Sequence, residues 1–252
     1  MQTSNVLYEF EGNVDDVVIP LRLISTDDED VIQSIVTATN QQTQLSREQL
    51  FAATEFPKKL ELFFQAYPEP NRLWYERRSR QYDRVPIKER LRIITQANLI
   101  RAFAGMFLEE PHRTTRNFNA LLDKIGKEIF VERHRLEPYY VAAFSLYKLE
   151  KLFKTRIDPK FKVARFQILL AFRRLANKDP LPQIGSREME SFCTKITDIL
   201  CDNTAADDLI EQASETVAEI IADNFDRDYI RTVAITDKIK KYPMGVAPPA
   251  ER

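Results

Sequence analysis

Apolar residues recur at helical spacing along most of the chain after Thr54, and this periodicity limits the fold more than any other feature of the sequence. The two clearest stretches run from Tyr139 to Phe153 and from Phe161 to Leu175, each with one apolar face. Further helices are predicted from Pro57 to Tyr67, from Pro86 to Ala102 and from Asp207 to Asn224. We therefore expect a mainly α fold built around a helical domain.

A small α/β element precedes this helical region. The β-rich run from Asp15 to Ile24 predicts a strand, and Pro20 within it is typical of an edge strand. Residues 25–29, Ser-Thr-Asp-Asp-Glu, supply capping side chains and negative charge at the start of a helix. A polar loop follows this helix, and Ser46 opens a second helix as a capping box.

These patterns divide the chain into four parts. We assign residues 1–56 to a partial α/β element, 57–182 to a helical domain with a basic extended segment, 183–242 to acidic C-terminal helices, and 243–252 to a disordered tail. The 252 residues hold no apolar run near the roughly 20 needed to span a bilayer. With two cysteines on one predicted helix, Cys193 and Cys201, a disulfide framework is not expected. We expect a soluble, cytoplasmic protein with no membrane partner.

Charge is segregated along the chain although the net charge is −1. Between Arg72 and Arg101 there are nine basic and three acidic residues, a net charge of +6. Between Glu188 and Asp228 there are twelve acidic and two basic residues, a net charge of −10. The first region could attract phosphate and the second would repel it, unless the two face each other within the fold.

The basic region begins with interleaved aromatic and basic side chains. Its candidate contacts are Trp74, Tyr75, Glu76, Arg77, Arg78 and Arg80. Aromatic rings can stack on bases while arginines neutralise phosphates, so the pattern is typical of nucleic-acid binding. It is equally typical of arginines that stack on aromatic rings inside a core.

Known catalytic patterns are missing from the sequence. The five glycines are scattered, and neither a P-loop nor a dinucleotide-binding glycine motif is present. The one acid-x-Lys triplet, Asp158-Pro159-Lys160, has proline at its centre and is a poor match for a nuclease site. His112 and His134 are the only histidines, and no Cys/His spacing indicates zinc. We expect no catalytic residue, no metal and no cofactor.

Several segments together resemble the AIPR family of abortive-infection phage-resistance proteins. The resemblance is carried by IPLRLI, by a helix ending in ATNQQTQLSREQL and by LWYERRSRQY, and it covers Gln2 to Phe153. Family members carry an Asn-Gly-x-Gln-Thr-Ser motif before the strand, and Gln2-Thr3-Ser4 looks like its end without the Asn and Gly. That departure implies the C-terminal portion of a longer protein. The resemblance also implies a role for Tyr75, Glu76 and Arg77, which look like part of a recurrent Tyr-Glu-Arg-Lys-type signature.

The N-terminal stretch is also similar, more weakly, to ParB/sulfiredoxin-like and DGQHR-type domains. By that similarity Gln2, Thr3, Asn40 and Gln42 would line a nucleotide- or DNA-handling pocket. Amide and hydroxyl groups can hydrogen-bond phosphate, ribose or base edges. The alternative is that Asn40 and Gln42 cap the preceding helix and bind loop backbone.

Two functions remain open at this point. The first is an antiphage protein fragment that recognises nucleic acid, a nucleotide or a phage component. The second is a structural or homo-oligomerisation module that supports a catalytic region N-terminal to this chain. An enzyme in its own right is the weakest alternative, and we expect no enzymatic activity from this chain alone.

Overall fold

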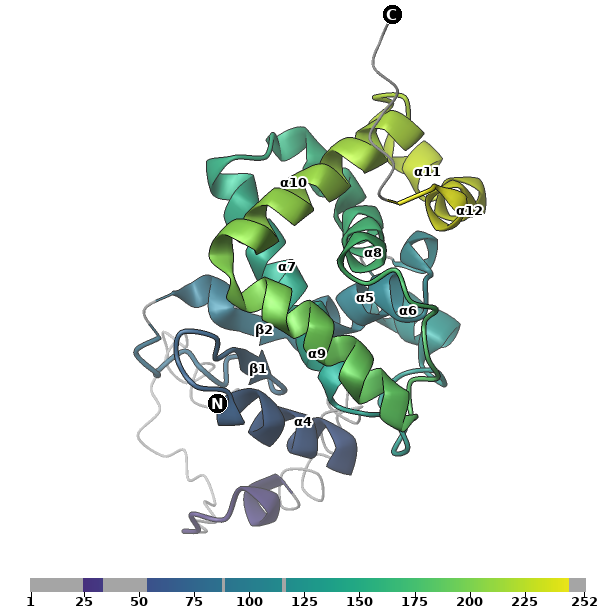
Figure 1. The fold of residues 1–252 in the computed structure, drawn as a ribbon. Coiled ribbons are helices and arrows are strands. Elements are labelled where there is room, and N and C mark those ends of the chain that lie inside the picture. Colours follow the sequence, from purple (N-terminus) through teal and green to yellow (C-terminus); the bar gives the residue numbers. More distant parts are fainter. Residues whose placement is uncertain (1–24, 34–53, 88, 115–116, 245–252) are drawn as a thin grey trace, which may run out of the picture. The chain divides into compact units, whose positions relative to one another are not determined.

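The structure is a computed structural model that describes residues 25–33, 54–87, 89–114 and 117–244 (Figure 1). The chain divides into two compact units, Met1–Gln44 and Leu45–Arg252. Within these described ranges the chain is mainly helical with a small parallel sheet, which confirms the predicted fold class. No described helix is long and apolar enough to cross a membrane.

The described part of the first unit contains one helix start, at residues 29–33. Asp28 Oδ1 accepts hydrogen bonds from the backbone N–H groups of Asp30 at 2.9 Å and Val31 at 3.2 Å. Thr26 Oγ1 accepts from the Asp28 N–H at 3.1 Å. These contacts confirm the predicted cap, because a side-chain oxygen satisfies backbone donors that have no partner within the helix. The predicted strand from Asp15 to Ile24 and the helix from Ser46 lie outside the described residues.

Helix α7 (Glu137–Thr155) is the centre of the second unit. Every residue from Pro138 to Leu149 is buried, so the helix is enclosed on all its faces rather than on one. It packs against α5 (Gln96–Met106), α8 (Arg165–Ala176), α9 (Arg187–Cys201) and α10 (Asn203–Ile220). The prediction of a core helix from Tyr139 to Phe153 is therefore confirmed.

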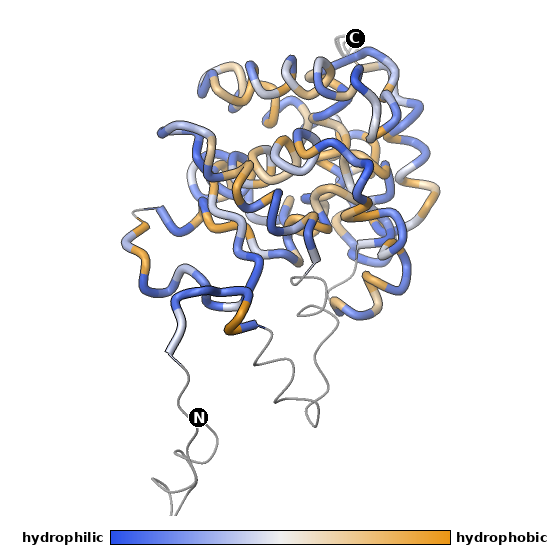
Figure 2. Tube along the Cα trace, turned by 90° about the horizontal axis from the view of Figure 1, so that it is seen from below, coloured by the Kyte–Doolittle hydropathy of each residue, from blue (hydrophilic) through white to orange (hydrophobic). Residues whose placement is uncertain are grey.

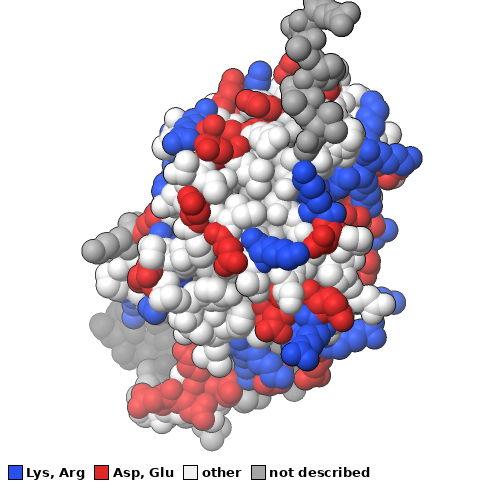
Figure 3. All heavy atoms as spheres, in the orientation of Figure 1, with Lys and Arg blue, Asp and Glu red and all other residues white. Residues whose placement is uncertain are grey.

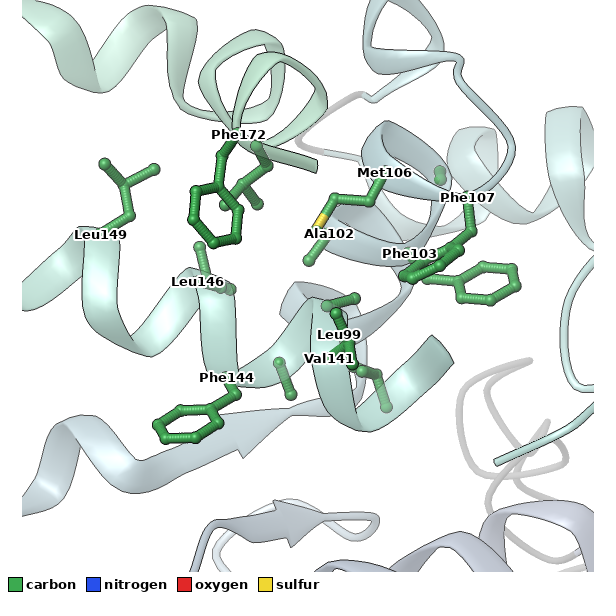
Figure 4. Close-up of a cluster of buried hydrophobic side chains, with 14 of the residues drawn as sticks. Leu99, Ala102, Phe103, Met106, Phe107, Val141, Phe144, Leu146, Leu149 and Phe172 are labelled. Carbon is green, nitrogen blue, oxygen red and sulfur yellow. The ribbon is translucent and has the colours of Figure 1, made fainter. Parts of the chain in front are cut away.

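One hydrophobic cluster joins these helices. In Figure 4 side chains of α5, among them Leu99, Phe103 and Met106, and Phe172 of α8 point into the space beside α7. Phe103 stacks on Tyr139 with ring centroids 4.0 Å apart. Figure 2 shows hydrophobic and hydrophilic residues alternating along the helices, as expected for segments with a buried and an exposed face. The acidic C-terminal helices share this core with the helices of residues 57–182.

The last two helices, α11 (Arg227–Ile230) and α12 (Val233–Lys241), lie against the C-terminal half of this core. Arg174 of α8 donates to the carbonyl oxygens of Ile239 and Tyr242, the latter at 3.1 Å. These carbonyls belong to the last turn of α12 and the residue after it, where backbone acceptors have no partner within the helix. Arg174 therefore caps the C-terminal end of α12.

At the opposite side of the unit, α4 (Glu55–Ala66) packs on a two-stranded parallel sheet. Strand β1 (Trp74–Glu76) pairs with β2 (Ile93–Thr95) in the register Trp74 with Ile93. The rings of Tyr67 and Tyr140 stack at 3.6 Å, and the Tyr140 hydroxyl donates to the Asn71 carbonyl at 2.7 Å. These contacts attach the segment before β1 to α7.

The predicted helix from Pro86 to Ala102 is wrong in its first half. The structure has a 3-10 turn, η1 (Arg90–Arg92), then β2, and α5 begins only at Gln96. Ile93, Ile94 and Thr95 are β-branched and favour a strand when a partner strand is present, and β1 provides that partner. Thr95 then caps α5 by accepting from the Asn98 N–H at 3.3 Å.

The predicted helix from Phe161 to Leu175 is also divided. Residues Pro159–Ala164 form the 3-10 helix η3, and α8 follows directly. Two shorter elements, η2 (Pro111–Arg113) and α6 (Phe118–Ile125), complete the described fold between α5 and α7.

The core predicts a clear contrast between two leucines. Leu99 of α5 is fully buried, whereas Leu62 of α4 is 68% exposed. We expect Leu99→Ala to lower the free energy of unfolding by about 2–5 kcal/mol because it leaves a cavity, and Leu62→Ala to change it by less than about 0.5 kcal/mol. Urea unfolding followed by circular dichroism measures both. Similar losses in the two variants would contradict this core.

His134 should make the fold sensitive to mild acid. Its Nδ1 lies 3.0 Å from the Tyr139 hydroxyl, and burial, followed by the charge of Arg133, lowers the pKa of His134 to about 4. A histidine with a lowered pKa in the folded chain stabilises the fold above its unfolded pKa of about 6.5. That stability is lost as the pH falls from about 6.5 through 4.

We therefore expect the free energy of unfolding to fall between about pH 7 and pH 5, by on the order of 1 kcal/mol because His134 is only partly buried. The variant His134→Gln has no titratable ring and should show a flatter profile. Urea unfolding at several pH values measures both slopes, and identical slopes would exclude this role of His134.

Candidate anion-binding site

The residues predicted to bind nucleic acid fall into two groups. Gln2, Thr3, Asn40 and Gln42 lie outside the residues that the structure describes. The others lie in β1 or follow it within a few residues: Trp74, Tyr75, Glu76, Arg77, Arg78 and Arg80. Their burial determines how much of this segment a ligand can reach.

Arg77 is buried and paired within the fold. Its Nε donates to Glu61 Oε2 of α4 at 3.0 Å, and the two side chains are 5% and 14% exposed. Glu61 also accepts hydrogen bonds from Gln81 Nε2 and, at 3.2 Å, from the Tyr82 hydroxyl. Burial, followed by the charge of Glu61, raises the pKa of Tyr82, so the hydroxyl stays protonated and donates. This network ties α4 to the segment after β1.

Other basic residues of the region bind backbone carbonyls. Arg90 Nη1 donates to the Tyr82 carbonyl at 2.8 Å. Arg92 Nη1 donates to the carbonyls of Pro70 and, at 3.2 Å, Arg72. A guanidinium has several donors in a fixed geometry, and these arginines use theirs on the chain itself. The net charge of +6 therefore overestimates how many arginine side chains of this region can contact an external anion.

The remaining predicted residues differ in exposure. Tyr75 is fully buried, while Trp74, Glu76 and Arg78 are partly exposed. Arg80 is exposed, as is Arg84 further along the chain. A ligand can therefore reach fewer of these side chains than the sequence pattern suggests.

A second group of basic residues surrounds a cavity of 440 Å³ elsewhere in the same unit. Its described lining comprises Asn98, Arg101, Thr114, Lys162, Val163, Arg165, Phe166, Gln167, Arg227 and Arg231. Half of these residues are basic, and no carboxylate is among them. We call this site the basic cavity.

A close approach of two helices forms one wall of the basic cavity. A Cβ atom at Gly105 of α5 would lie 3.1 Å from the Phe166 carbonyl oxygen and 3.3 Å from Phe166 Cβ. Glycine at this position lets α5 and α8 come together, and Arg101 lies one turn earlier on α5. Arg101 and Phe166 therefore line the same cavity.

Three contacts hold together the elements that carry the rest of the lining. Phe161 of η3 packs edge-to-face on Phe225, with ring centroids 4.9 Å apart, and Lys160 Nζ lies 5.0 Å from the Phe225 ring. Gln167 of α8 is buried and donates from Nε2 to the Ile230 carbonyl of α11 at 3.0 Å. These contacts fix η3 and α8 against α11, and so bring the basic residues of these elements to one cavity.

The five basic residues are not equally engaged. Arg165 Nη1 forms an ion pair with Glu150 Oε1 at 2.8 Å. Lys162 is exposed and Arg227 partly exposed, and neither side chain has an ion pair or hydrogen bond within the part of the chain that the structure describes. Two of the five cationic side chains, Lys162 and Arg227, therefore lie at the cavity without a described counter-ion, and positive charge of this kind favours an anionic ligand. The arrangement can bind phosphate or another polyanion.

A second hollow, of 490 Å³ between α10 and α12, provides a contrast. Its described lining has Glu219 and Asp237 beside Lys238 and Lys241, so its charges balance. In Figure 3 acidic side chains are spread over α9 and α10, while basic ones gather over α12. The excess of positive charge thus distinguishes the basic cavity from this hollow.

Sequence patterns did not reveal the basic cavity, because its residues are separated by up to 133 positions, from Asn98 to Arg231. Of its basic residues, only Arg101 falls in the predicted basic region. Arg227 was counted within an acidic stretch, and Lys162 and Arg165 within a core helix. The one local signal is Arg227 and Arg231, spaced four residues apart after a run of acidic residues.

The two cysteines and two histidines, all within the described ranges, have side-chain contacts inside the fold. Burial raises the pKa of the Cys193 thiol, which disfavours the reactive thiolate. His112 Nδ1 lies 3.1 Å from Thr236 Oγ1. In the described ranges, no group of three or more His, Cys, Asp or Glu side chains could hold a metal ion.

The Arg77–Glu61 pair leads to a stability prediction. We expect Arg77→Ala to lower the free energy of unfolding by about 3 kcal/mol, because it leaves the largely buried Glu61 carboxylate without its cationic partner. Arg80→Ala, at an exposed position, should change it by less than about 0.5 kcal/mol. Urea unfolding of both variants measures the difference. An equal, small effect would mean that the pair does not hold α4 to this segment.

Comparison with known proteins gives one match. A family model described as AIPR protein matches residues 1–227, which extends the resemblance carried by the sequence motifs beyond Phe153. Searches of curated proteins and of solved structures found no match. The similarity to ParB/sulfiredoxin-like and DGQHR-type domains stays a prediction. Since the family model covers most of the 252 residues, the chain belongs to the AIPR family, a membership that suggests a role in abortive-infection resistance to phage.

Proposed function

We propose that this AIPR-family chain recognises a phosphate-bearing ligand, either nucleic acid or a nucleotide, during resistance to phage. The observation that supports the proposal is the basic cavity, where five basic residues from separate segments line one hollow without a described carboxylate. Phosphate is the anionic group common to both ligand classes, and arginine binds it with two parallel hydrogen bonds.

The engagement of these side chains also supports the proposal. Lys162 and Arg227 have no described ion pair or hydrogen bond that a phosphate would have to displace. Arg90 and Arg92, by contrast, would have to give up hydrogen bonds to backbone carbonyls before contacting a ligand. A phosphate can therefore contact Lys162 and Arg227 without breaking a described hydrogen bond, whereas contact with Arg90 or Arg92 would break one.

Two double variants separate these surfaces. The cavity variant combines Lys162→Gln with Arg227→Gln, and the segment variant combines Arg80→Gln with Arg84→Gln. All four positions are exposed or partly exposed, and every change removes one positive charge while keeping a polar side chain. The two variants are therefore matched in net charge.

Fluorescence anisotropy with single-stranded and double-stranded DNA over a salt series tests the proposal. We expect the wild type to bind at low salt with a steep salt dependence, and the cavity variant to lose at least tenfold in affinity. Its salt slope should decrease by about 1.5, because each lost phosphate contact removes about 0.7–0.9 from the slope. The segment variant should bind like the wild type.

The opposite results are equally informative. A loss confined to the segment variant would place the contact at the predicted segment and overturn the role of the basic cavity. No binding of either DNA or of ATP at low salt, together with a stable dimer in light scattering, would overturn the recognition function and favour an assembly module.

A further inference from the structure

We propose that the basic cavity is a binding site for a nucleoside triphosphate, an inference that rests on the proposed function and specifies its ligand. The size of the site is the first reason. A hollow of 440 Å³ lies within the range of about 300–1,000 Å³ for sites that enclose small ligands. A nucleic-acid duplex presents its phosphates on a convex surface and can contact only the rim of such a hollow, whereas one nucleotide can enter it.

The density of charge is the second reason. A nucleic-acid strand carries one negative charge per nucleotide, spread along the backbone. A nucleoside triphosphate concentrates about four negative charges in three linked groups, since its terminal phosphate carries close to two at neutral pH. Several basic side chains around one hollow match this concentrated charge better than they match a single phosphodiester.

The lining also contains groups that a purely inorganic anion would not need. Phe166 is partly exposed and can offer its ring to a base, and Val163, three residues earlier, is 39% exposed. Asn98, exposed at the first turn of α5, has an amide that can donate to and accept from a base edge. A base can therefore contact apolar and amide groups while its phosphates contact the basic residues.

Direct contact with the phosphates follows from the same lining. Its described residues include no carboxylate that could hold a magnesium ion beside the phosphates. The triphosphate would be neutralised by arginine and lysine side chains instead. Binding should therefore persist when magnesium is removed.

Fluorescence titration of the full chain with ribose-labelled fluorescent ATP tests the inference, with ATP, AMP, inorganic triphosphate and a single-stranded oligonucleotide as competitors. We expect ATP to compete at least tenfold better than AMP, with and without EDTA. The cavity variant should lose at least tenfold in affinity for the labelled ATP. Asn98→Ala should weaken ATP about three- to tenfold, as expected for one lost hydrogen bond, and leave inorganic triphosphate unchanged.

The matched control combines Lys154→Gln with Arg187→Gln, two exposed residues that do not line the basic cavity. It removes the same charge and should bind labelled ATP like the wild type. An equal loss in this control would mean that net charge, rather than the site, determines binding, and would overturn the inference.

The competitors separate failure of the inference from failure of the proposed function. If inorganic triphosphate competes as well as ATP, the site binds polyphosphate without recognising the base, and the inference of a nucleoside triphosphate site is overturned. A requirement for magnesium would overturn direct contact with the phosphates. Oligonucleotide binding that depends on the cavity residues, without ATP binding, would overturn this inference and keep the proposed function, whereas binding of neither would overturn both.

Discussion

The complete burial of α7 is the constraint on which the second unit depends. A helix enclosed from Pro138 to Leu149 cannot be stable unless neighbours cover every face. Helices α5, α8, α9 and α10 provide that cover: α9 and α10 each bury one apolar face, and α5 and α8 are buried over most of their own surface. Even the one charged residue in that run is accommodated, because Lys148 Nζ donates to Asn203 Oδ1 at 2.6 Å. The positions of the remaining elements follow from this arrangement.

Much of the fold could be predicted from sequence, because amphipathic periodicity is a local property. The spacing of apolar residues from Tyr139 to Phe153 was enough to predict α7. The failure at Pro86 has a different cause, since Ile93 to Thr95 form a strand only where β1 lies beside them. That partner is about twenty positions away in the sequence, so no local pattern contains it. A pairing of two three-residue strands is too short to leave its own periodicity.

The candidate site was less predictable, for a related reason. Counting charges identified a basic region, but the count cannot distinguish an arginine that faces solvent from one such as Arg77, which is paired with Glu61 inside the fold. Conversely, the charge count missed Arg227 because its neighbours in the sequence are acidic. Those acidic residues are not among the residues that line the basic cavity. Net charge along a chain reports composition, whereas binding depends on which charges meet and which are already paired. The family resemblance identified the protein family, but it did not indicate which side chains come together in the basic cavity.

The contact at Gly105 connects the core to the basic cavity. At Gly105, α5 and α8 approach each other so closely that an added Cβ would press on Phe166, and both helices line the hollow. A bulkier residue at that position would act as a spacer between them. The width of the basic cavity thus depends on helix packing in the interior of the protein. A substitution in that packing changes the width, and with it the size of ligand that fits, without contacting the ligand.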